Sequence, residues 1–434
     1  MLSFPLKVHD EVWGYISLTE FEKDLIDTSP FQRLNHIRQL GSAYRVFPGA
    51  QHTRFSHSLG VLHVLDRIIT SDYLRENFDE YSRRKLRIAA LLHDIGHFPF
   101  SHTIEKAITD KEGAHLEFGE YMIKKTCLAD KLRKESFDPD DIIRIIKGDS
   151  PEKNGLCTQL ISSDLDADRI DYLMRDAVHT GVAYGRVDIN RIFDAFRLDN
   201  EGHLSVHISG KHAAENYVIG RYHMWATVYT HRVVNGFCEL LQHAYCELMD
   251  AGEVHNLDEL MKLSEFELSK YDDNYLLSAL ANYSSDKDFT KEIYEMWRNR
   301  IHLEVVDEAQ KLTAEDVGTR KYFKLDEFKK DSELERLAQG SKVPKKWIFH
   351  NNSDVNLPRY RPLSEPLTTD THDTQKEMLK TIYIVDEGGN SKPLTDDNTS
   401  LVYYVRNMGL STVRIYTKQE YKSQLEETLA KMLT

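Results

Sequence analysis

A cluster of side chains suited to metal binding directly follows an apolar helical run, and its members are His93, Asp94, His97 and His102. His93 and Asp94 are adjacent, so one imidazole nitrogen and one carboxylate oxygen can bind the same divalent ion. His97 follows four residues after His93, and on a continuing helix both rings would lean over one face. Gly96 and Pro99 favour a helix end here. A lone histidine on an apolar helix is usually a core residue, but this clustering predicts a metal site in a cleft.

Further metal ligands must come from other segments, because His93 and Asp94 leave most of the coordination sphere empty. Upstream, His57 lies where the chain leads into a helical pattern of apolar residues. Downstream, the segment Asp164–Asp176, taken as a helix, places four charged side chains on one face: Asp164, Asp168, Asp171 and Arg175. Such a face is commonly only solvated, but here it offers a further carboxylate. Two histidines and two aspartates suit Mn, Fe, Zn or Mg and need no cysteine.

Mainly helical elements are expected to position these side chains. Helical periodicity runs from about Thr19 to Asp250 and again from Asn256 to Gln310, and the second stretch includes a predicted helix from Thr290 to Val305. Two short β-hairpins are predicted as well, one from Lys7 to Leu18 and one from Arg197 to Ser209.

The C-terminal third differs in composition. Residues 350–375 are rich in Asn, Asp, Pro and Thr, which predicts a loop. Two strands at 380–385 and 411–416, with a turn between them, and a helix from Gln419 to Leu433 are expected to follow. We therefore expect three units: residues 1–250 as a core that carries the first hairpin, 251–349 as a helical extension, and 350–434 as a small α+β lobe.

The global composition restricts the classes of partner. The 434 residues carry 56 Lys and Arg against 70 Asp and Glu, a net charge of −14, so nucleic acid is not expected as a partner. Four cysteines lie scattered without metal or redox spacing, which is typical of reduced thiols. No apolar run approaches the length of a membrane span, and the start shows no signal-peptide pattern. A cytoplasmic protein without a membrane partner is the expectation.

The motifs around the histidine cluster resemble those of HD-domain metal-dependent phosphohydrolases, whose H…HD…D pattern is matched by His57, His93, Asp94 and Asp168. Further segments occur in the order and spacing of one subfamily: Asp27–Leu34, Gln39–Gly41, Val46–Ala50, Arg54–Gly60 and His93–His97. Over roughly residues 5–250 the chain is similar to the SAM-and-HD type of deoxynucleoside triphosphate (dNTP) triphosphohydrolase, without the SAM domain. The resemblance implies an HD-domain helical core, and together with the sequence patterns it gives a mainly α fold with small β-hairpins and a C-terminal α+β lobe.

The resemblance implies hydrolysis of a dNTP to a deoxynucleoside and tripolyphosphate, by attack of water on the α-phosphorus. A divalent metal (Mn, Mg, Fe or Zn) held by the four residues of the H…HD…D pattern would polarise phosphoryl oxygens and lower the pKa of bound water. The leaving O5′ needs a general acid, a role that suits histidine. The family pattern points to His115 and His102, with His97 supporting them or contacting phosphate, and leaves open which ring transfers the proton.

The resemblance also assigns the substrate contacts, namely Gln39, Leu40, Arg54, Tyr172, Asp176, Arg221 and Tyr229. Arg54 lies three residues before the ligand His57, which predicts a place at the edge of the metal. Arg221, Trp225 and Tyr229 succeed one another at one-turn spacing, so a helix would present an arginine and two aromatic rings on one face. In the family pattern Tyr172 and Asp176 hold the sugar 3′-hydroxyl and leave no room for a 2′-hydroxyl, and a site that hydrogen-bonds a hydroxyl discriminates strongly.

Relatives of this type are commonly dimers of dimers, so a homo-tetramer is expected, and some bind a nucleotide effector between subunits. Asp27 and Gln32 match the residues that read a guanine effector, but Asn35 stands where the pattern has arginine. Asparagine has no guanidinium, so a weaker dependence on guanine or a different effector is expected.

Two other interpretations remain open at the level of sequence. An HD phosphohydrolase could act on another nucleotide, such as a monophosphate or a signalling nucleotide. A nucleotide-sensing protein could keep the same side chains without turnover. The complete ligand set and the three candidate histidines favour an active enzyme.

Overall fold

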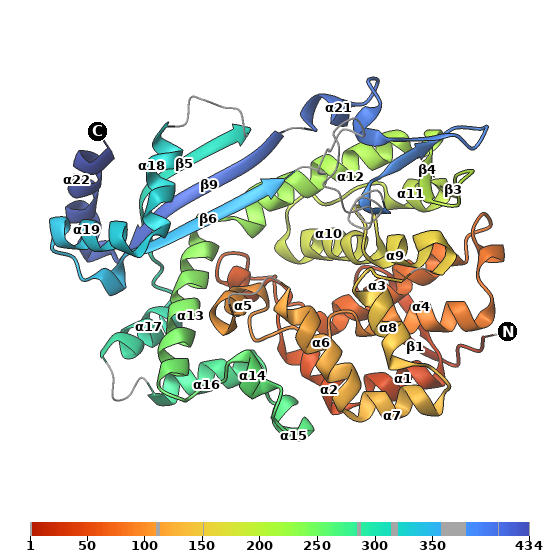
Figure 1. Cartoon of the computed structure of the whole chain (residues 1–434), viewed down its shortest axis with the longest axis horizontal. Coiled ribbons are helices and arrows are strands. Elements are labelled where there is room, and N and C mark those ends of the chain that lie inside the picture. Colours follow the sequence, from red (N-terminus) through yellow and green to blue (C-terminus); the bar gives the residue numbers. More distant parts are fainter. Residues whose placement is uncertain are drawn as a thin grey trace, which may run out of the picture.

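The computed structural model describes residues 2–109, 113–150, 152–283, 288–313, 320–356, 379–406 and 408–433. The chain is mainly α-helical, as predicted, with three small sheets (Figure 1). A continuous apolar core reaches from Ile16 near the N-terminus to Leu429 near the C-terminus. Within the described residues no helix combines the length and apolarity that crossing a membrane requires.

The described part of the first 250 residues contains thirteen α-helices, and the predicted metal ligands lie among them. They are α1 Glu20–Ile26, α2 Ser29–Gln32, α3 Arg54–Ile69, α4 Glu80–Leu92, α5 His102–Ile108, α6 Ala114–Lys125, α7 Cys127–Lys134, α8 Pro139–Ile146, α9 Leu156–Ile161, α10 Ala167–Thr180, α11 Ile189–Ala195, α12 Lys211–Met224 and α13 Arg232–Asp250.

The later helices are shorter on average, and α21 lies near α12, away from α18, α19 and α22 (Figure 1). They are α14 Leu257–Leu260, α15 Glu265–Leu268, α16 Asp273–Tyr283, α17 Asp288–Arg298, α18 Arg320–Asp326, α19 Asp331–Ser341, α21 Leu401–Val405 and α22 Lys422–Leu433.

Helix α3 carries His57, α10 carries Asp168, and His93 and Asp94 directly follow α4. Helix α3 packs against both α4 and α10 in the core. Their ends are defined by local hydrogen bonds. The Asp79 carboxylate accepts from the amide of Ser82 at the start of α4, and the Asp166 carboxylate accepts from the amide of Arg169 at the start of α10. Gly181 ends α10 in the left-handed conformation, with φ +77°. These caps fix where each ligand-bearing turn begins and ends.

Both predicted β-hairpins are present. Strands β1 (Leu6–Asp10) and β2 (Gly14–Leu18) pair antiparallel, with Asp10 opposite Gly14 at the turn. Strands β3 (Phe196–Leu198) and β4 (Leu204–His207) form the second hairpin. The second hairpin continues into a four-stranded sheet in the order β3-β4-β7-β8, since β4 pairs parallel with β7 (Tyr383–Val385), which pairs with β8 (Ser391–Pro393).

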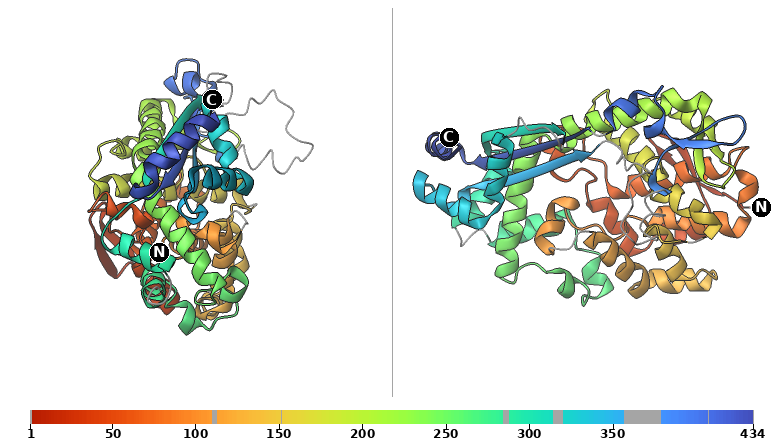
Figure 2. Two further views of the ribbon diagram at one scale, coloured as in Figure 1. Left: turned by 90° about the vertical axis from the view of Figure 1, so that its left-hand side faces the viewer. Right: turned by 45° about the horizontal axis from the view of Figure 1, so that its top comes forward.

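The third sheet has the order β5-β9-β6 and consists of β5 (Glu304–Thr313), β6 (Phe349–Asn356) and β9 (Met408–Thr417). The central strand β9 pairs antiparallel with both neighbours. In both Figure 1 and Figure 2 this sheet lies toward the end of the molecule that carries α19 and α22, and hairpin β1–β2 lies toward the other end.

Three local predictions were wrong. The helix predicted to reach Val305 ends at Arg298, and the predicted helical stretch to Gln310 contains strand β5. Buried residues Leu303, Val306 and Ala309 are spaced three apart because a bulge interrupts the strand between Val305 and Asp307, and this spacing imitates a helix.

The predicted loop at 350–375 is also wrong in its first part, because residues up to Asn356 form β6, and the rest lies outside the described residues. The predicted strands at 380–385 and 411–416 exist, but they do not pair with each other. The division into three units stays a prediction, although strands of the third segment pair with strands of the first and the second.

Candidate active site

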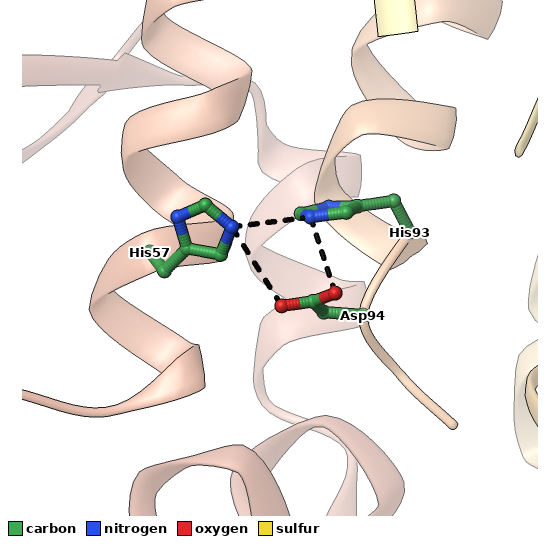
Figure 3. A group of neighbouring side chains, drawn as sticks. All are labelled: His57, His93 and Asp94. Atoms are coloured by element: carbon green, nitrogen blue, oxygen red, sulfur yellow. Dashed lines mark hydrogen bonds and ion pairs between the residues drawn. The ribbon is translucent and has the colours of Figure 1, made fainter. Parts of the chain in front are cut away.

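The predicted metal ligands converge at the junction of α3, α4 and α10. The Nε2 atom of His57 lies 3.3 Å from Nε2 of His93, 3.0 Å from Oδ1 of Asp168 and 3.7 Å from Oδ2 of Asp94. The Nε2 atom of His93 lies 3.3 Å from Oδ1 of Asp94 and 3.8 Å from Oδ1 of Asp168. Figure 3 shows the two rings and the Asp94 carboxylate turned toward one another. Two nitrogens and carboxylate oxygens thus face a common point.

The Nδ1 nitrogen of each ring, on the side away from the candidate metal position, has a hydrogen-bond partner of its own. Nδ1 of His57 lies 2.7 Å from Oδ2 of Asp171, and Nδ1 of His93 lies 2.7 Å from the carbonyl oxygen of Ala90. Both partners are acceptors, so each Nδ1 donates and each Nε2 faces the centre, where a bound cation would take the place of the Nε2 proton. Outer hydrogen bonds of this kind orient histidine ligands in metal sites.

The electrostatics of the centre favour a positive charge. Burial by itself lowers the pKa of His57, but hydrogen bonds to Asp168 and Asp171 outweigh it and raise the pKa to about 10. Burial by itself raises the pKa of Asp94, but the Arg54 guanidinium and the neighbouring histidines hold it well below its ordinary value. A centre with two carboxylates and two inward Nε2 atoms fits a divalent cation, as the donor set predicts. His57, His93 and Asp94 form a group whose ligand atoms all lie within 4.8 Å of one another.

The helix ends near Gly96 and Pro99, as predicted, so the arrangement expected for a continuing helix does not apply. Helix α4 ends at Leu92, and His97 does not lie beside His93 on a helical face. Instead Nε2 of His97 contacts Oδ1 of Asp94 at 3.1 Å. Gly96 makes this turn possible, because a Cβ there would lie 2.2 Å from the carbonyl oxygen of His115 and from the amide of Gly119 on α6. The close crossing brings α6 against the turn.

A second cluster, made of His102, Glu105 and His115, lies beside the metal centre. Oε2 of Glu105 is 2.8 Å from Nδ1 of His102, and Oε1 is 2.7 Å from Nδ1 of His115. The ring of His115 stacks on that of His97, with centroids 4.6 Å apart and 8° between the planes. The His102 side chain is 65% exposed and that of His115 is 22% exposed. Glu105 thus holds both histidines.

Burial by itself raises the pKa of Glu105, but the hydrogen bonds to His102 and His115 outweigh it and hold that pKa well below its ordinary value. The carboxylate is therefore ionised, and Nδ1 of His115 donates to it. The backbone amide of His115 donates to the same carboxylate at 3.0 Å, which fixes the start of α6.

One cavity of about 710 Å³ joins these groups, and this volume is typical of a small-molecule site. Its walls include most of the sequence-predicted site residues: Gln39, Leu40, Arg54, His93, Asp94, His97, His102, His115, Asp168, Tyr172, Asp176 and Tyr229. His57 is fully buried behind the wall.

Arg54 lies at the edge of the metal centre, as predicted, with its Nη1 2.6 Å from Oδ2 of Asp94. At another wall of the cavity Tyr229 donates to Oδ2 of Asp176 at 2.5 Å, and Nε2 of His52 contacts Oδ1 of the same carboxylate at 2.8 Å. The amide oxygen of Gln39 is buried without a hydrogen-bond partner among the described residues. The cavity therefore has an ordered hydroxyl–carboxylate pair as well as metal ligands.

Besides His57, three predicted residues lie outside this cavity wall. Arg221 contacts Oδ1 of Asp164 at 3.2 Å, and Asp164 precedes α10 instead of lying on its face. Asp27 is exposed and forms an ion pair with Lys23. Gln32 donates to the carbonyl of Ile26 and accepts from Asn35.

The local geometry after Arg221 also differs from the prediction. Helix α12 ends at Met224, and Trp225–Tyr229 forms one π-helical turn, in which the amide of Thr230 donates to the carbonyl of Trp225 at 3.0 Å. Such wide turns recur at functional sites. The turn puts Trp225 and Tyr229 on the cavity wall, while Arg221 stays with Asp164.

Several polar residues around the cavity were missed by sequence reasoning. Arg169, Lys106 and Lys147 contribute cationic side chains to its wall. Glu105 could have been found from its position three residues after His102 on a helix, a spacing at which side chains meet. Nothing in the local sequence marks Lys147, which comes to the cavity from α8 through the fold.

Comparisons with known proteins identify the family of this chain. The sequence pattern of the HD domain matches residues 54–176, and that of the HD associated region matches residues 187–357. The uncharacterized protein YwfO of Bacillus subtilis is 32% identical over 406 residues, which span 89% of this chain and 88% of that protein. The chain therefore belongs to the HD-domain superfamily of phosphohydrolases.

Two curated relatives carry the name of one activity. The deoxynucleoside triphosphate triphosphohydrolase SAMHD1 of Homo sapiens is 28% identical over 286 residues, 57% of this chain and 45% of that protein. Its homologue in Dictyostelium discoideum is 28% identical over 322 residues, 69% of this chain and 60% of that protein. The match thus covers only part of each of these enzymes.

Solved structures share the whole fold. A hypothetical protein from Aquifex aeolicus superposes with a TM-score of 0.73 and 28% identity, covering 98% of this chain and 99% of that one. A phosphohydrolase from Bacteroides thetaiotaomicron has the same TM-score of 0.73 at 23% identity, over 95% of this chain and 100% of that one.

Proposed function

We propose that this protein hydrolyses dNTPs to a deoxynucleoside and tripolyphosphate. The observation that carries the proposal is the shared cavity, whose wall combines a His–Asp metal centre, a histidine pair held by a carboxylate, and a tyrosine–aspartate pair. These are the groups that phosphoryl activation, leaving-group protonation and sugar binding require. The curated relatives named as dNTP triphosphohydrolases support the choice of substrate.

A divalent metal held by His57, His93, Asp94 and Asp168 would supply Lewis-acid activation of the α-phosphoryl group and of water. The donor set admits Mn, Mg, Fe or Zn. Arg54, fixed between Asp94 and the Ser101 hydroxyl, adds a buried positive charge at this edge of the cavity. Arg169, Lys106 and Lys147 add further positive charge to the wall, with Arg169 paired to Asp166 and Lys147 to Glu120.

We assign the general acid to His115, with His102 as its neighbour and His97 as a support. Glu105 accepts the Nδ1 proton of His115, so the remaining nitrogen is the one that can protonate the leaving O5′ of the deoxynucleoside. His97 is already engaged with Asp94, and its ring stacks on His115 and holds it in place. This arrangement supports proton donation by His115 on the substrate side of the metal.

The sugar is proposed to lie against Tyr172, Leu40 and the Tyr229–Asp176 pair, with Gln39 near the 3′-hydroxyl. The unpartnered amide oxygen of Gln39 can accept a hydrogen bond from that hydroxyl. Packing of Tyr172 and Tyr229 at a ring-centroid distance of 6.3 Å narrows the space for a 2′-hydroxyl. Arg221 remains a proposed phosphate contact, which requires that it exchange Asp164 for the substrate.

Regulation and assembly belong to the same proposal. We propose a homo-tetramer, arranged as a dimer of dimers, with a nucleotide effector read by Asp27 and Gln32 on the α1–α2 segment. Asn35, in place of arginine, is engaged with Gln32 at 3.0 Å, and it offers no guanidinium to a phosphate or base. Dependence on a guanine nucleotide is therefore expected to be weak.

The proposal is tested by anion-exchange separation of the products formed from a mixture of the four dNTPs. Manganese-loaded protein is incubated with and without GTP, and His93→Ala and Asp94→Ala serve as inactive variants. We expect deoxynucleosides and tripolyphosphate in equal amounts from the wild type and neither product from the variants. Products without tripolyphosphate point to another nucleotide substrate, and binding without any turnover points to a nucleotide sensor.

A further inference from the structure

We infer that the tip of the N-terminal hairpin, Asp10–Gly14, is a working part of the metal centre, because it holds the carboxylate that positions ligand His57. The inference rests on the metal site of the proposed function and links the hairpin tip, which lies before the matched HD domain, to residues inside that domain, which spans residues 54–176. It assigns positioning roles to Asp171, Arg175 and Trp13.

The first step is the contact between His57 and Asp171. Both side chains are fully buried, and Oδ2 of Asp171 lies 2.7 Å from Nδ1 of His57. The Asp171 carboxylate accepts the Nδ1 hydrogen and so turns Nε2 toward the metal position, where a bound cation would replace the Nε2 proton. Loss of the carboxylate would allow the other tautomer, which points a hydrogen at the metal.

Asp171 in turn is held by donors on both of its oxygens. Arg175, one turn later on α10, donates from Nε to Oδ2 at 2.9 Å and from Nη2 to Oδ1 at 3.0 Å. The indole Nε1 of Trp13 donates to Oδ1 at 2.5 Å. These three hydrogen bonds fix the orientation of the Asp171 carboxylate. His57 occupies the acceptor position that remains on it.

The hairpin tip also holds Arg175, the residue that positions Asp171. Oδ2 of Asp10 accepts from Nη1 of Arg175 at 2.9 Å, and Oδ1 of Asp10 accepts from the amides of Val12 and Trp13 at 2.9 Å each. Oε1 of Glu11 also accepts from Nη1 of Arg175, at 3.0 Å. The Asp10 side chain therefore shapes the turn that presents the Trp13 indole, and it also pairs with the buried Arg175.

Helices α3 and α10 pack so closely that the Asp171–Arg175 ion pair fits between them only because residue 60 is glycine. A Cβ on Gly60 would lie 1.8 Å from Oδ1 of Asp171 and 2.4 Å from Nη2 of Arg175. The residue at 60, three positions after His57, must therefore lack a side chain for the ion pair to lie against the ligand helix. The ion pair of Asp171 and Arg175 therefore occupies a space that the glycine at position 60 leaves open.

The same tip also reaches the tyrosine–aspartate pair of the cavity. Oε1 of Glu11 contacts Nε2 of His179 at 2.7 Å, and the His179 ring stacks on His52 with centroids 4.3 Å apart. His52 holds Asp176. One turn of chain thus supports the metal ligand through Asp171 and the proposed sugar contact through His52.

The inference is tested by the affinity of chelator-treated protein for Mn²⁺, measured by isothermal titration calorimetry. Asp171→Asn keeps the size of the side chain but removes the carboxylate, and we expect Mn²⁺ to bind about 10- to 100-fold more weakly. Trp13→Phe keeps the ring against His63 and removes the N–H donor, so we expect a loss in the same direction but smaller. Asp66→Asn is the matched control, since Asp66 is on α3 like His57 but pairs with Arg83 and Arg87.

Thermal unfolding of each metal-free variant separates stability from positioning. If Asp171→Asn and Trp13→Phe bind Mn²⁺ as tightly as Asp66→Asn does, the hairpin tip has only a structural role and the inference is overturned. Should Asp171→Asn fail to fold, Trp13→Phe alone decides the question. Because Mn²⁺ affinity is measured without nucleotide, an absence of dNTP hydrolysis would contradict the proposed function without deciding this inference.

Discussion

Glu105 contacts both histidines that are candidates for the general acid, one carboxylate oxygen to each ring. The two rings are held with different firmness. The backbone amide of His115 donates a second hydrogen bond to the same carboxylate, and the His115 ring stacks on His97. His102 is mostly exposed, and besides its side-chain contact with Glu105 its ring lies edge to face against His97 and His115. The better-held ring is the one expected to give a proton to the leaving oxygen.

Replacing His115 with glutamine is therefore expected to lower kcat by about 10²- to 10⁴-fold, the usual contribution of a general acid. KM for the dNTP should change much less, because the metal ligands and the cationic residues remain. The matched variant His102→Gln should lose less activity. Steady-state kinetics with a single dNTP measures both, and a larger loss in His102→Gln would move the acid role to His102.

The lowered pKa of Glu105 has a consequence for stability against pH. A carboxyl group whose pKa is lower in the folded state stabilises the fold above its ordinary value of 4.5, and this contribution is lost as the pH falls toward the folded pKa. Wild-type protein should therefore lose stability faster than Glu105→Gln between about pH 5 and pH 3. Urea unfolding of metal-free protein at a series of pH values checks this, and parallel curves would contradict it.

Much of the candidate site was predictable from sequence because metal ligands need particular side chains. The four predicted ligands meet, and Arg54 contacts Asp94 as its position three residues before His57 suggested. The supporting groups were harder to find. Asp171 was noticed only as part of an acidic face, and the contact with Trp13 spans 158 residues, which no local pattern can reveal.

Among the helices and strands, Gly96 sets how closely α6 approaches the turn that carries His93 and Asp94. A methyl group at Gly96 would lie 2.2 Å from backbone atoms of α6, which cannot move away without shifting His115. A Cβ on Gly119, across the same crossing, would meet its neighbours at ordinary distances of 3.5 Å or more. The two glycines therefore differ in what they tolerate.

We predict that Gly96→Ala lowers the free energy of unfolding by about 1–3 kcal/mol, the usual cost of overpacking. Gly119→Ala should be neutral or slightly stabilising, since alanine favours a helix over glycine by about 0.5–1 kcal/mol. Urea unfolding of both variants gives the comparison. Equal effects of the two substitutions would show that this crossing is not tightly packed.

Elements whose hydrogen bonds are local were predicted well, and those that depend on distant partners were not. Hairpin β1–β2 and helices α3, α4 and α10 follow from periodicity and turn residues close in sequence. Strand β6 is rich in polar residues and is specified by pairing with β9, far along the chain. The π-helical turn at Trp225–Tyr229 likewise cannot be told from an α-helix by residue spacing.

For the molecule as a whole, the α+β segment at the C-terminus joins two sheets that begin elsewhere in the chain. Strand β7 extends the hairpin β3–β4, and β9 lies between β5 and β6. Residues of β6 and α13 also line the cavity. The C-terminal half therefore contributes to the candidate site itself, although the recognisable motifs all lie in the first 250 residues.

The proposed effector site and the proposed tetramer lead to a prediction for the whole molecule. If Asn35 is what weakens guanine dependence, Asn35→Arg should increase the stimulation of dNTP hydrolysis by GTP severalfold over the wild type. Asn35→Ala controls for loss of the contact with Gln32. Light scattering after size exclusion should give the mass of a tetramer in the active sample. An unchanged response to GTP in Asn35→Arg would show that Asn35 is not the cause of weak guanine dependence.

The most direct test of the central claim follows the oxygen of the attacking water. Hydrolysis of one dNTP in H₂¹⁸O by manganese-loaded protein is analysed by mass spectrometry of both products. We predict that ¹⁸O enters the tripolyphosphate and that the deoxynucleoside carries none, because water attacks the α-phosphorus and O5′ leaves with a proton. Labelled 5′-hydroxyl, or labelled orthophosphate together with a deoxynucleoside diphosphate, would contradict the proposed reaction.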